Sequence, residues 1–189
     1  MENKEIATIR TITGELIGGF ILYGIPFAIL YSIIFGLISK VIPSESLIIT
    51  AIVAIILQGL SAFFIWKCSI AATFRKRSID RNDVPTVIRN LLIFTVILCF
   101  ISALMNFSDV NQRIDKTINS NASLQLSESF MKYMYDDQQI AQYQAEKEEA
   151  ISEAKTKLYT YLAVLEIGLL VVYLGVVPLQ KKSILKYAV

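Results

Sequence analysis

Residues 16–39 read LIGGFILYGIPFAILYSIIFGLIS, which is 24 residues in succession without a charged side chain. About 20 apolar helical residues cross the hydrocarbon core of a bilayer, so this run is long enough to span it. It is also longer than the apolar part of a secretory signal peptide, and we expect it to remain in the mature protein. The run therefore indicates an integral membrane protein.

Three further apolar runs follow, and 54% of the 189 residues are hydrophobic, more than a soluble domain of this size can bury. The predicted spans are residues 16–39, 46–66, 90–107 and 158–179. Backbone groups find no water in hydrocarbon, so each span is expected to be an α-helix. The predicted fold class is all-α: an integral membrane four-helix bundle in which residues 16–66 form a transmembrane hairpin.

Basic residues predict the orientation of the spans. The segment 67–89 carries Lys67, Arg75, Lys76, Arg77, Arg81 and Arg89. Short loops rich in Lys and Arg stay in the cytoplasm. We therefore expect a multi-pass protein of the cell membrane, with residues 1–15, 67–89 and 180–189, and so both termini, on the cytoplasmic side. Four of these cations, Arg75, Lys76, Arg77 and Arg81, are also candidate contacts for anionic lipid.

Residues 108–157 are expected outside the cytoplasm as a helical hairpin that extends the third and fourth spans. Val110, Ile114 and Ile118 recur every four residues, the spacing of one helix face. The predicted tip of the hairpin contains the apolar residues Phe130, Tyr133, Met134 and Tyr135. An exposed patch of this kind is typical of a docking surface, whereas a buried one would complete the core of the hairpin itself.

Glu166 is the only formal charge inside the four predicted spans. At about 1.5 Å per residue it lies roughly 12 Å from the outer end of its span, and Ser102 reaches a similar depth. Gln58 lies deeper but comes within reach if the helices are staggered. These three residues form a predicted intramembrane polar cluster. Its carboxyl group either stays protonated and hydrogen-bonds between helices, titrates in a proton or cation path, or pairs with a basic residue of another subunit.

Several functional classes are disfavoured by composition. The chain has no histidine, which removes the commonest metal ligand and the usual general base. The two cysteines, Cys68 and Cys99, are too few for a four-ligand zinc site and are interpreted as packing residues. A net charge of +2 does not suggest a nucleic-acid partner. We expect no catalytic site, no metal and no cofactor.

Trp66 lies at the end of a predicted span, and we expect its ring to anchor that span at headgroup depth.

Two functional hypotheses remain. The first is a non-enzymatic accessory or sensor-like subunit in the lipid bilayer. It would engage a membrane-protein partner, or a second copy of itself, through the outer hairpin or the bundle surface. The alternative is a subunit of an oligomeric proton- or cation-conducting channel or transporter that uses Glu166. An enzyme acting on lipid through Asp80 and Asp83 ranks behind both, because their spacing is not diagnostic of a metal site.

Overall fold

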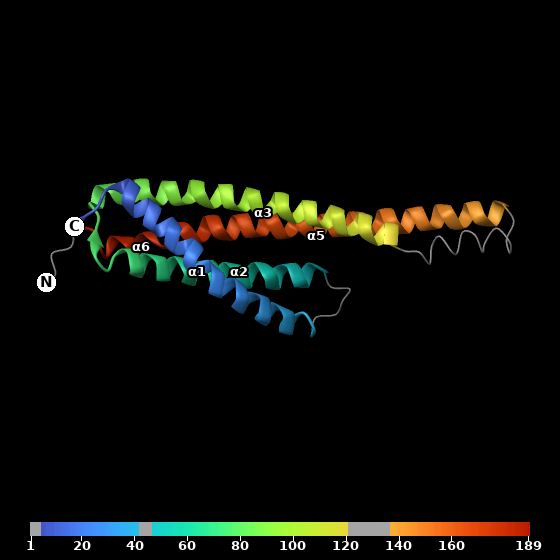
Figure 1. The fold of residues 1–189 in the computed structure, drawn as a ribbon, viewed down its shortest axis with the longest axis horizontal. Coiled ribbons are helices and arrows are strands. Elements are labelled where there is room, and N and C mark those ends of the chain that lie inside the picture. The colour runs from blue at the N-terminus through green and yellow to red at the C-terminus, as the bar shows by residue number, and fades with distance from the viewer. Residues whose placement is uncertain (1–4, 42–46, 121–136) are drawn as a thin grey trace. The chain divides into compact units, whose positions relative to one another are not determined.

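The computed structural model describes residues 5–41, 47–120 and 137–189, which are mostly helical (Figure 1). Its elements are β1 (Glu5–Ile6), α1 (Ile9–Ile38), α2 (Leu47–Thr73), β2 (Arg77–Ser78), the 3-10 turn η1 (Arg81–Asp83), α3 (Val84–Ser120), α5 (Asp137–Leu179) and α6 (Lys181–Leu185). The chain forms two compact units. The first contains Met1–Ile101 and Val164–Val189, and the second contains Ser102–Ala163.

Among the described residues, four helices are long and apolar enough to cross a membrane: Ile9–Ile38, Ile48–Thr73, Arg81–Gln112 and Ile151–Leu185. The predicted all-α class is confirmed, and the four apolar helices fit a multi-pass membrane protein. Each helix continues beyond the apolar run that predicted it. Hydropathy marks where the side chains become polar, whereas the backbone hydrogen bonds of a helix continue past that point.

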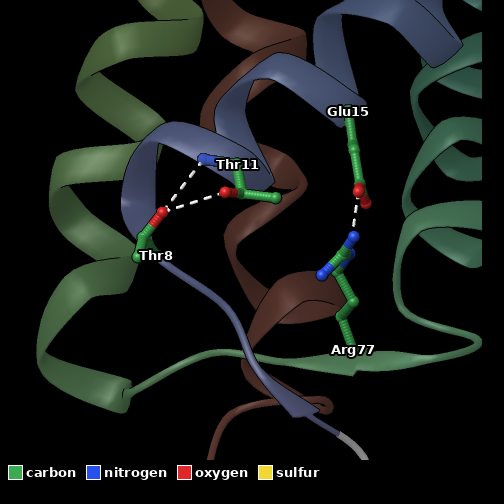
Figure 2. A network of polar contacts seen from close by, with 4 residues as sticks. All are labelled: Thr8, Thr11, Glu15 and Arg77. Atoms are coloured by element: carbon green, nitrogen blue, oxygen red, sulfur yellow. Dashed lines mark hydrogen bonds and ion pairs between the residues drawn. The ribbon is translucent and has the colours of Figure 1, made fainter.

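Helix α1 begins with a side-chain cap. The Thr8 hydroxyl accepts a hydrogen bond from the Thr11 backbone N–H at 3.3 Å, and the two threonine hydroxyls lie 2.9 Å apart (Figure 2). A capping oxygen of this kind satisfies one of the N–H groups that have no partner within the helix. The cap fixes the start of α1 well before its apolar run.

Helices α1 and α2 approach closely where α1 lacks a side chain. The Ser69 hydroxyl of α2 donates a hydrogen bond to the Leu16 carbonyl of α1 at 2.7 Å, and Ser69 is fully buried. A Cβ atom at Gly19 would collide with the Ser69 hydroxyl oxygen and lie 3.1 Å from the Ser69 Cβ. Small residues allow helix backbones to approach in this way, so glycine at 19 is what permits the bond.

Helices α2 and α5 pack through two reciprocal pairs of small and large residues. Gly168 of α5 faces the side chain of Ile55, and four residues further along each helix Gly59 of α2 faces Val172. A Cβ atom at either glycine would collide with its aliphatic partner. Because both pairs advance in the same chain direction, α2 and α5 run parallel at this contact.

An aromatic contact joins α1, α2 and α3. The ring of Phe20 lies 4.4 Å from that of Trp66 and meets Phe94 edge-on at 6.1 Å between centroids. Trp66 is only 2% exposed. Its expected role as an anchor among lipid headgroups is therefore wrong, because the indole ring packs against neighbouring helices instead. The interpretation of the cysteines as packing residues holds for Cys99, which is buried, but not for Cys68, which is exposed.

Both ends of the chain pair with the segment between α2 and α3. Ser78 and Ile79 in that segment are buried, so their backbone groups need partners within the protein. Strand β1 pairs in parallel with β2, and the Ala7 N–H donates to the Ser78 carbonyl at 3.1 Å. The Val189 N–H donates to the Ile79 carbonyl at 3.0 Å. The described residues at the two ends of the chain thus lie at the same basic segment.

The contact at Gly19 gives a stability prediction. We expect Gly19→Ala to lower the free energy of unfolding by about 1–3 kcal/mol, because the added methyl group forces α1 away from Ser69. Adding Ser69→Ala should recover part of that loss by removing the colliding oxygen. Thermal unfolding of the purified protein in one detergent would measure both effects.

Gly18→Ala is the matched control, because a Cβ atom at Gly18 has no neighbour within 4 Å. We expect it to be neutral or slightly stabilising, since alanine favours helix over glycine. Equal destabilisation by the two alanine substitutions would contradict the role assigned to Gly19.

Candidate functional site

Glu166 lies on α5 in the first compact unit and is 9% exposed. It is close enough to Cys99 of α3 and to Tyr173 of its own helix to interact electrostatically with both side chains. Glu166 and Tyr173 are seven residues apart, which places them on the same face of α5. The single carboxyl group of the predicted spans is therefore directed into the protein.

Gln58 connects three helices through its side-chain amide. Its Nε2 donates to the Tyr31 hydroxyl of α1 at 3.2 Å, and its Oε1 accepts from the Tyr173 hydroxyl of α5 at 3.2 Å. Polar groups at this depth have no water to bond, so such pairs join helices in lipid. The amide thus completes a hydrogen-bonded chain from Tyr31 through Gln58 to Tyr173.

The predicted polar cluster consists of Glu166, Gln58 and Ser102. Glu166 and Gln58 belong to the first compact unit, whereas Ser102 is half-buried and belongs to the second. A contact of Ser102 or Gln58 with Glu166 remains a prediction. The sequence reasoning missed Tyr31 and Tyr173, although tyrosine hydroxyls inside apolar spans are a signal, because a buried hydroxyl usually has a hydrogen-bond partner.

A cavity of about 280 Å³ adjoins the hydrogen-bonded chain in the first unit. Its lining comes from α1, α2, α3 and α5 and includes Gly24, Tyr31, Gln58, Leu98 and Tyr173. A smaller cavity of about 180 Å³ lies between α1 and α2 and shares Phe27, Tyr31 and Ser61 with the first. Apolar walls with a few polar groups are typical of sites for small molecules, and here they surround the Tyr31–Gln58–Tyr173 chain.

A basic pocket is formed where α2 ends and β2 begins. Arg75, Lys76 and Arg77 line it together with Glu15 of α1, and its volume is about 310 Å³. The Arg77 Nε lies 2.7 Å from the Glu15 carboxylate (Figure 2). Arg81 is exposed on η1 and does not line this pocket. The structure thus brings together three of the four cations predicted to contact anionic lipid.

The candidate partner-contact residues of the hairpin tip, Phe130, Tyr133, Met134 and Tyr135, lie outside the described residues. No protein-family model, curated protein or solved structure matches this chain.

The two hydrogen bonds of Gln58 predict how substitutions at Gln58, Tyr31 and Tyr173 change the free energy of unfolding. We expect Gln58→Leu to lower the free energy of unfolding by about 1–2 kcal/mol, because both tyrosine hydroxyls lose a partner in a site without water. Adding Tyr31→Phe and Tyr173→Phe should recover most of the loss, since the triple variant has no unsatisfied hydroxyl. Unfolding in detergent would be followed by circular dichroism.

Ser61→Ala serves as the control, because the Ser61 hydroxyl bonds the Leu57 carbonyl of its own helix and no other helix depends on it. Its expected effect is below about 0.5 kcal/mol. If the triple variant were less stable than Gln58→Leu alone, the three side chains would not act as one hydrogen-bonded chain.

Proposed function

We propose that this protein is a non-enzymatic, multi-pass membrane protein that serves as an accessory or sensor-like subunit and engages a partner protein through the helical hairpin of α3 and α5. The observation that carries the proposal is helix length. Helices α3 and α5 contain 37 and 43 residues. At 1.5 Å per residue they measure about 55 Å and 65 Å, whereas a hydrocarbon core is about 30 Å thick. Much of each helix is therefore available outside the membrane.

Side-chain contacts between the two helices support this proposal. In the second compact unit the Tyr159 hydroxyl of α5 donates a hydrogen bond to the Asn111 side-chain oxygen of α3. The rings of Tyr159 and Phe107 are stacked, with centroids 6.3 Å apart and planes inclined by 11°. A hairpin whose helices are already joined loses less conformational entropy when it binds a partner.

The surface of α5 in this unit is suited to a water-exposed interface. Glu148 and Glu149 are exposed, and Glu153 pairs with Lys157 at 2.6 Å one helical turn away. Residues 137–157 carry five acidic and three basic side chains. Charged groups of one prevailing sign favour the approach of a partner with a complementary basic surface. The absence of histidine from the chain supports a role without catalysis.

The proposed orientation places the basic segment and both termini in the cytoplasm and the hairpin on the opposite side. The excess of Lys and Arg between α2 and α3 supports it. Because β1 and Val189 pair with this segment, both ends of the chain lie on the same side of the membrane as the segment. The protein is proposed to reside in the cell membrane, and its partner would then bind from outside the cytoplasm.

Photocrosslinking in intact cells tests the proposal. A benzoylphenylalanine in place of Glu148 or Glu149 should give an adduct of one defined mass. The Glu148→Lys/Glu149→Lys variant, with the probe at the exposed Gln138, should give less of this adduct than the same probe in the unaltered protein.

Labelling with a membrane-impermeant maleimide tests the orientation. In a Cys68→Ala background, the reagent should label Glu148→Cys but not Lys181→Cys.

Probes at Ile33 and Ile97, which are exposed on predicted spans, are the controls and should not give this adduct. An adduct of twice the chain mass identifies a second copy as the partner. If no hairpin position gave a defined adduct, the hairpin would not be the docking surface. If the maleimide labelled Lys181→Cys from outside, the proposed orientation would be wrong.

A second candidate function is supported by the intramembrane polar chain. Tyr173, Gln58 and Tyr31 form a hydrogen-bonded chain from α5 to α1 and line the cavity of about 280 Å³, and Glu166 lies on the same face of α5 as Tyr173. Carboxyl groups inside membranes often mark ion or proton pathways, and a cavity lined by polar side chains can admit the water that carries protons. This arrangement is the basis for proposing a proton- or cation-conducting subunit as the alternative.

Flux measurements in sealed liposomes distinguish the alternative. If the protein conducts protons, a pH gradient should drive a flux that falls at least tenfold in Glu166→Gln, because the amide cannot take up and release a proton. Glu153→Gln, a carboxyl of the charged α5 surface, is the control and should leave the flux unchanged. A flux equal to that of empty liposomes, or one unaffected by Glu166→Gln, would exclude the role of this residue in conduction.

A further inference from the structure

The pocket at the end of α2 gathers three cations whose arrangement is partly set by other elements of the fold. It is lined by Glu15, Ala72, Thr73, Arg75, Lys76 and Arg77. The carboxylate of Glu15 on α1 holds the Arg77 Nε at 2.7 Å, and Ser78, the next residue, is fixed by the pairing of β2 with β1. The position of the third cation is thus determined by two other elements of the fold.

The charge of the lining favours an anion. Three basic side chains and one acidic side chain leave a formal charge of +2. The carboxyl end of α2 opposes this with a partial charge of about −0.5, which does not cancel it. Arg75 and Lys76 are exposed, and Thr73 adds a hydroxyl group to the lining. Guanidinium, ammonium and hydroxyl groups together supply the donors that phosphate oxygens accept.

The position of the pocket along α2 selects the kind of anion. The candidate span of α2, Ile48–Thr73, reaches Thr73, and Arg75, Lys76 and Arg77 follow shortly after it. The headgroup layer of a bilayer extends about 5–8 Å beyond the hydrocarbon on each side. The lining residues of the pocket therefore lie where the phosphates of lipids are found.

From this geometry we infer that the pocket of Glu15, Thr73, Arg75, Lys76 and Arg77 binds the phosphate headgroup of an anionic phospholipid. A volume of about 310 Å³ is small for a ligand site and suits a headgroup of this size. Arg75 and Lys76 contact the phosphate, and Glu15 acts as a positioning residue through Arg77. None of these residues belongs to the hairpin, so lipid binding at this pocket is independent of the proposed function.

Native mass spectrometry of the full chain, released from detergent with added dioleoyl phosphatidylglycerol, tests the site. We expect Arg75→Gln/Lys76→Gln to weaken binding of this lipid by about tenfold or more, as the loss of two cations near a phosphate requires. Lys181→Gln/Lys182→Gln is the matched control. It removes the same charge from two exposed residues of α6 that do not line the pocket, and it should change binding less than threefold.

A charge-conserving variant tests the same site if Arg75→Gln/Lys76→Gln does not fold. Arg75→Lys/Lys76→Arg should bind phosphatidylglycerol within threefold of the unaltered protein, and dioleoyl phosphatidylcholine should bind at least tenfold more weakly than phosphatidylglycerol. If the pocket and α6 substitutions weakened phosphatidylglycerol binding equally, the assignment of the lipid site to this pocket would be wrong. Displacement of the lipid by millimolar inorganic phosphate would overturn the assignment to a lipid, because the pocket would then bind free phosphate.

Discussion

The close approach of α1 and α2 at Gly19 is the contact on which the first compact unit depends. Lipid tails are as apolar as the helices, so no hydrophobic force brings spans together, and packing and hydrogen bonds must do so. Glycine at 19 lets the buried Ser69 hydroxyl reach the Leu16 carbonyl. The neighbouring Phe20 then lies on Trp66 and against Phe94 of α3. One residue without a side chain thus positions three helices.

The same principle positions the polar chain. Gly59 and Gly168 let α2 and α5 approach in parallel, each against an aliphatic side chain of the other helix. Gln58 directly precedes Gly59, and Tyr173 directly follows Val172, which packs on Gly59. The close packing of the two helices therefore brings the amide within reach of the Tyr173 hydroxyl. Packing and polar chemistry are linked here, because the glycines that join the helices also fix the distance of the hydrogen bond.

The two ends of the long helices carry different chemistry. Between α2 and α3 the chain concentrates cations, and their position is fixed by Glu15 and by the pairing of both chain ends with the segment at Ser78 and Ile79. In the second unit, α5 carries an excess of acidic residues. The first surface is therefore basic and the second acidic. The carboxyl group of Glu166 belongs to neither surface, because it lies within the apolar part of α5.

The sequence by itself determined the number of apolar helices, the all-α class and the position of Glu166 as the one charge inside the predicted spans, because each follows from local composition and from the need of backbone groups in lipid to bond within a helix. It did not determine which faces of the helices meet. The spans are apolar on every side, so periodicity does not distinguish a buried face from one exposed to lipid. The partners of Gln58, the burial of Trp66 and the pairing of both chain ends with residues 77–79 were decided only by the tertiary structure. These contacts join residues far apart in the chain, and they depend on how each helix is rotated and how closely its glycines let it approach.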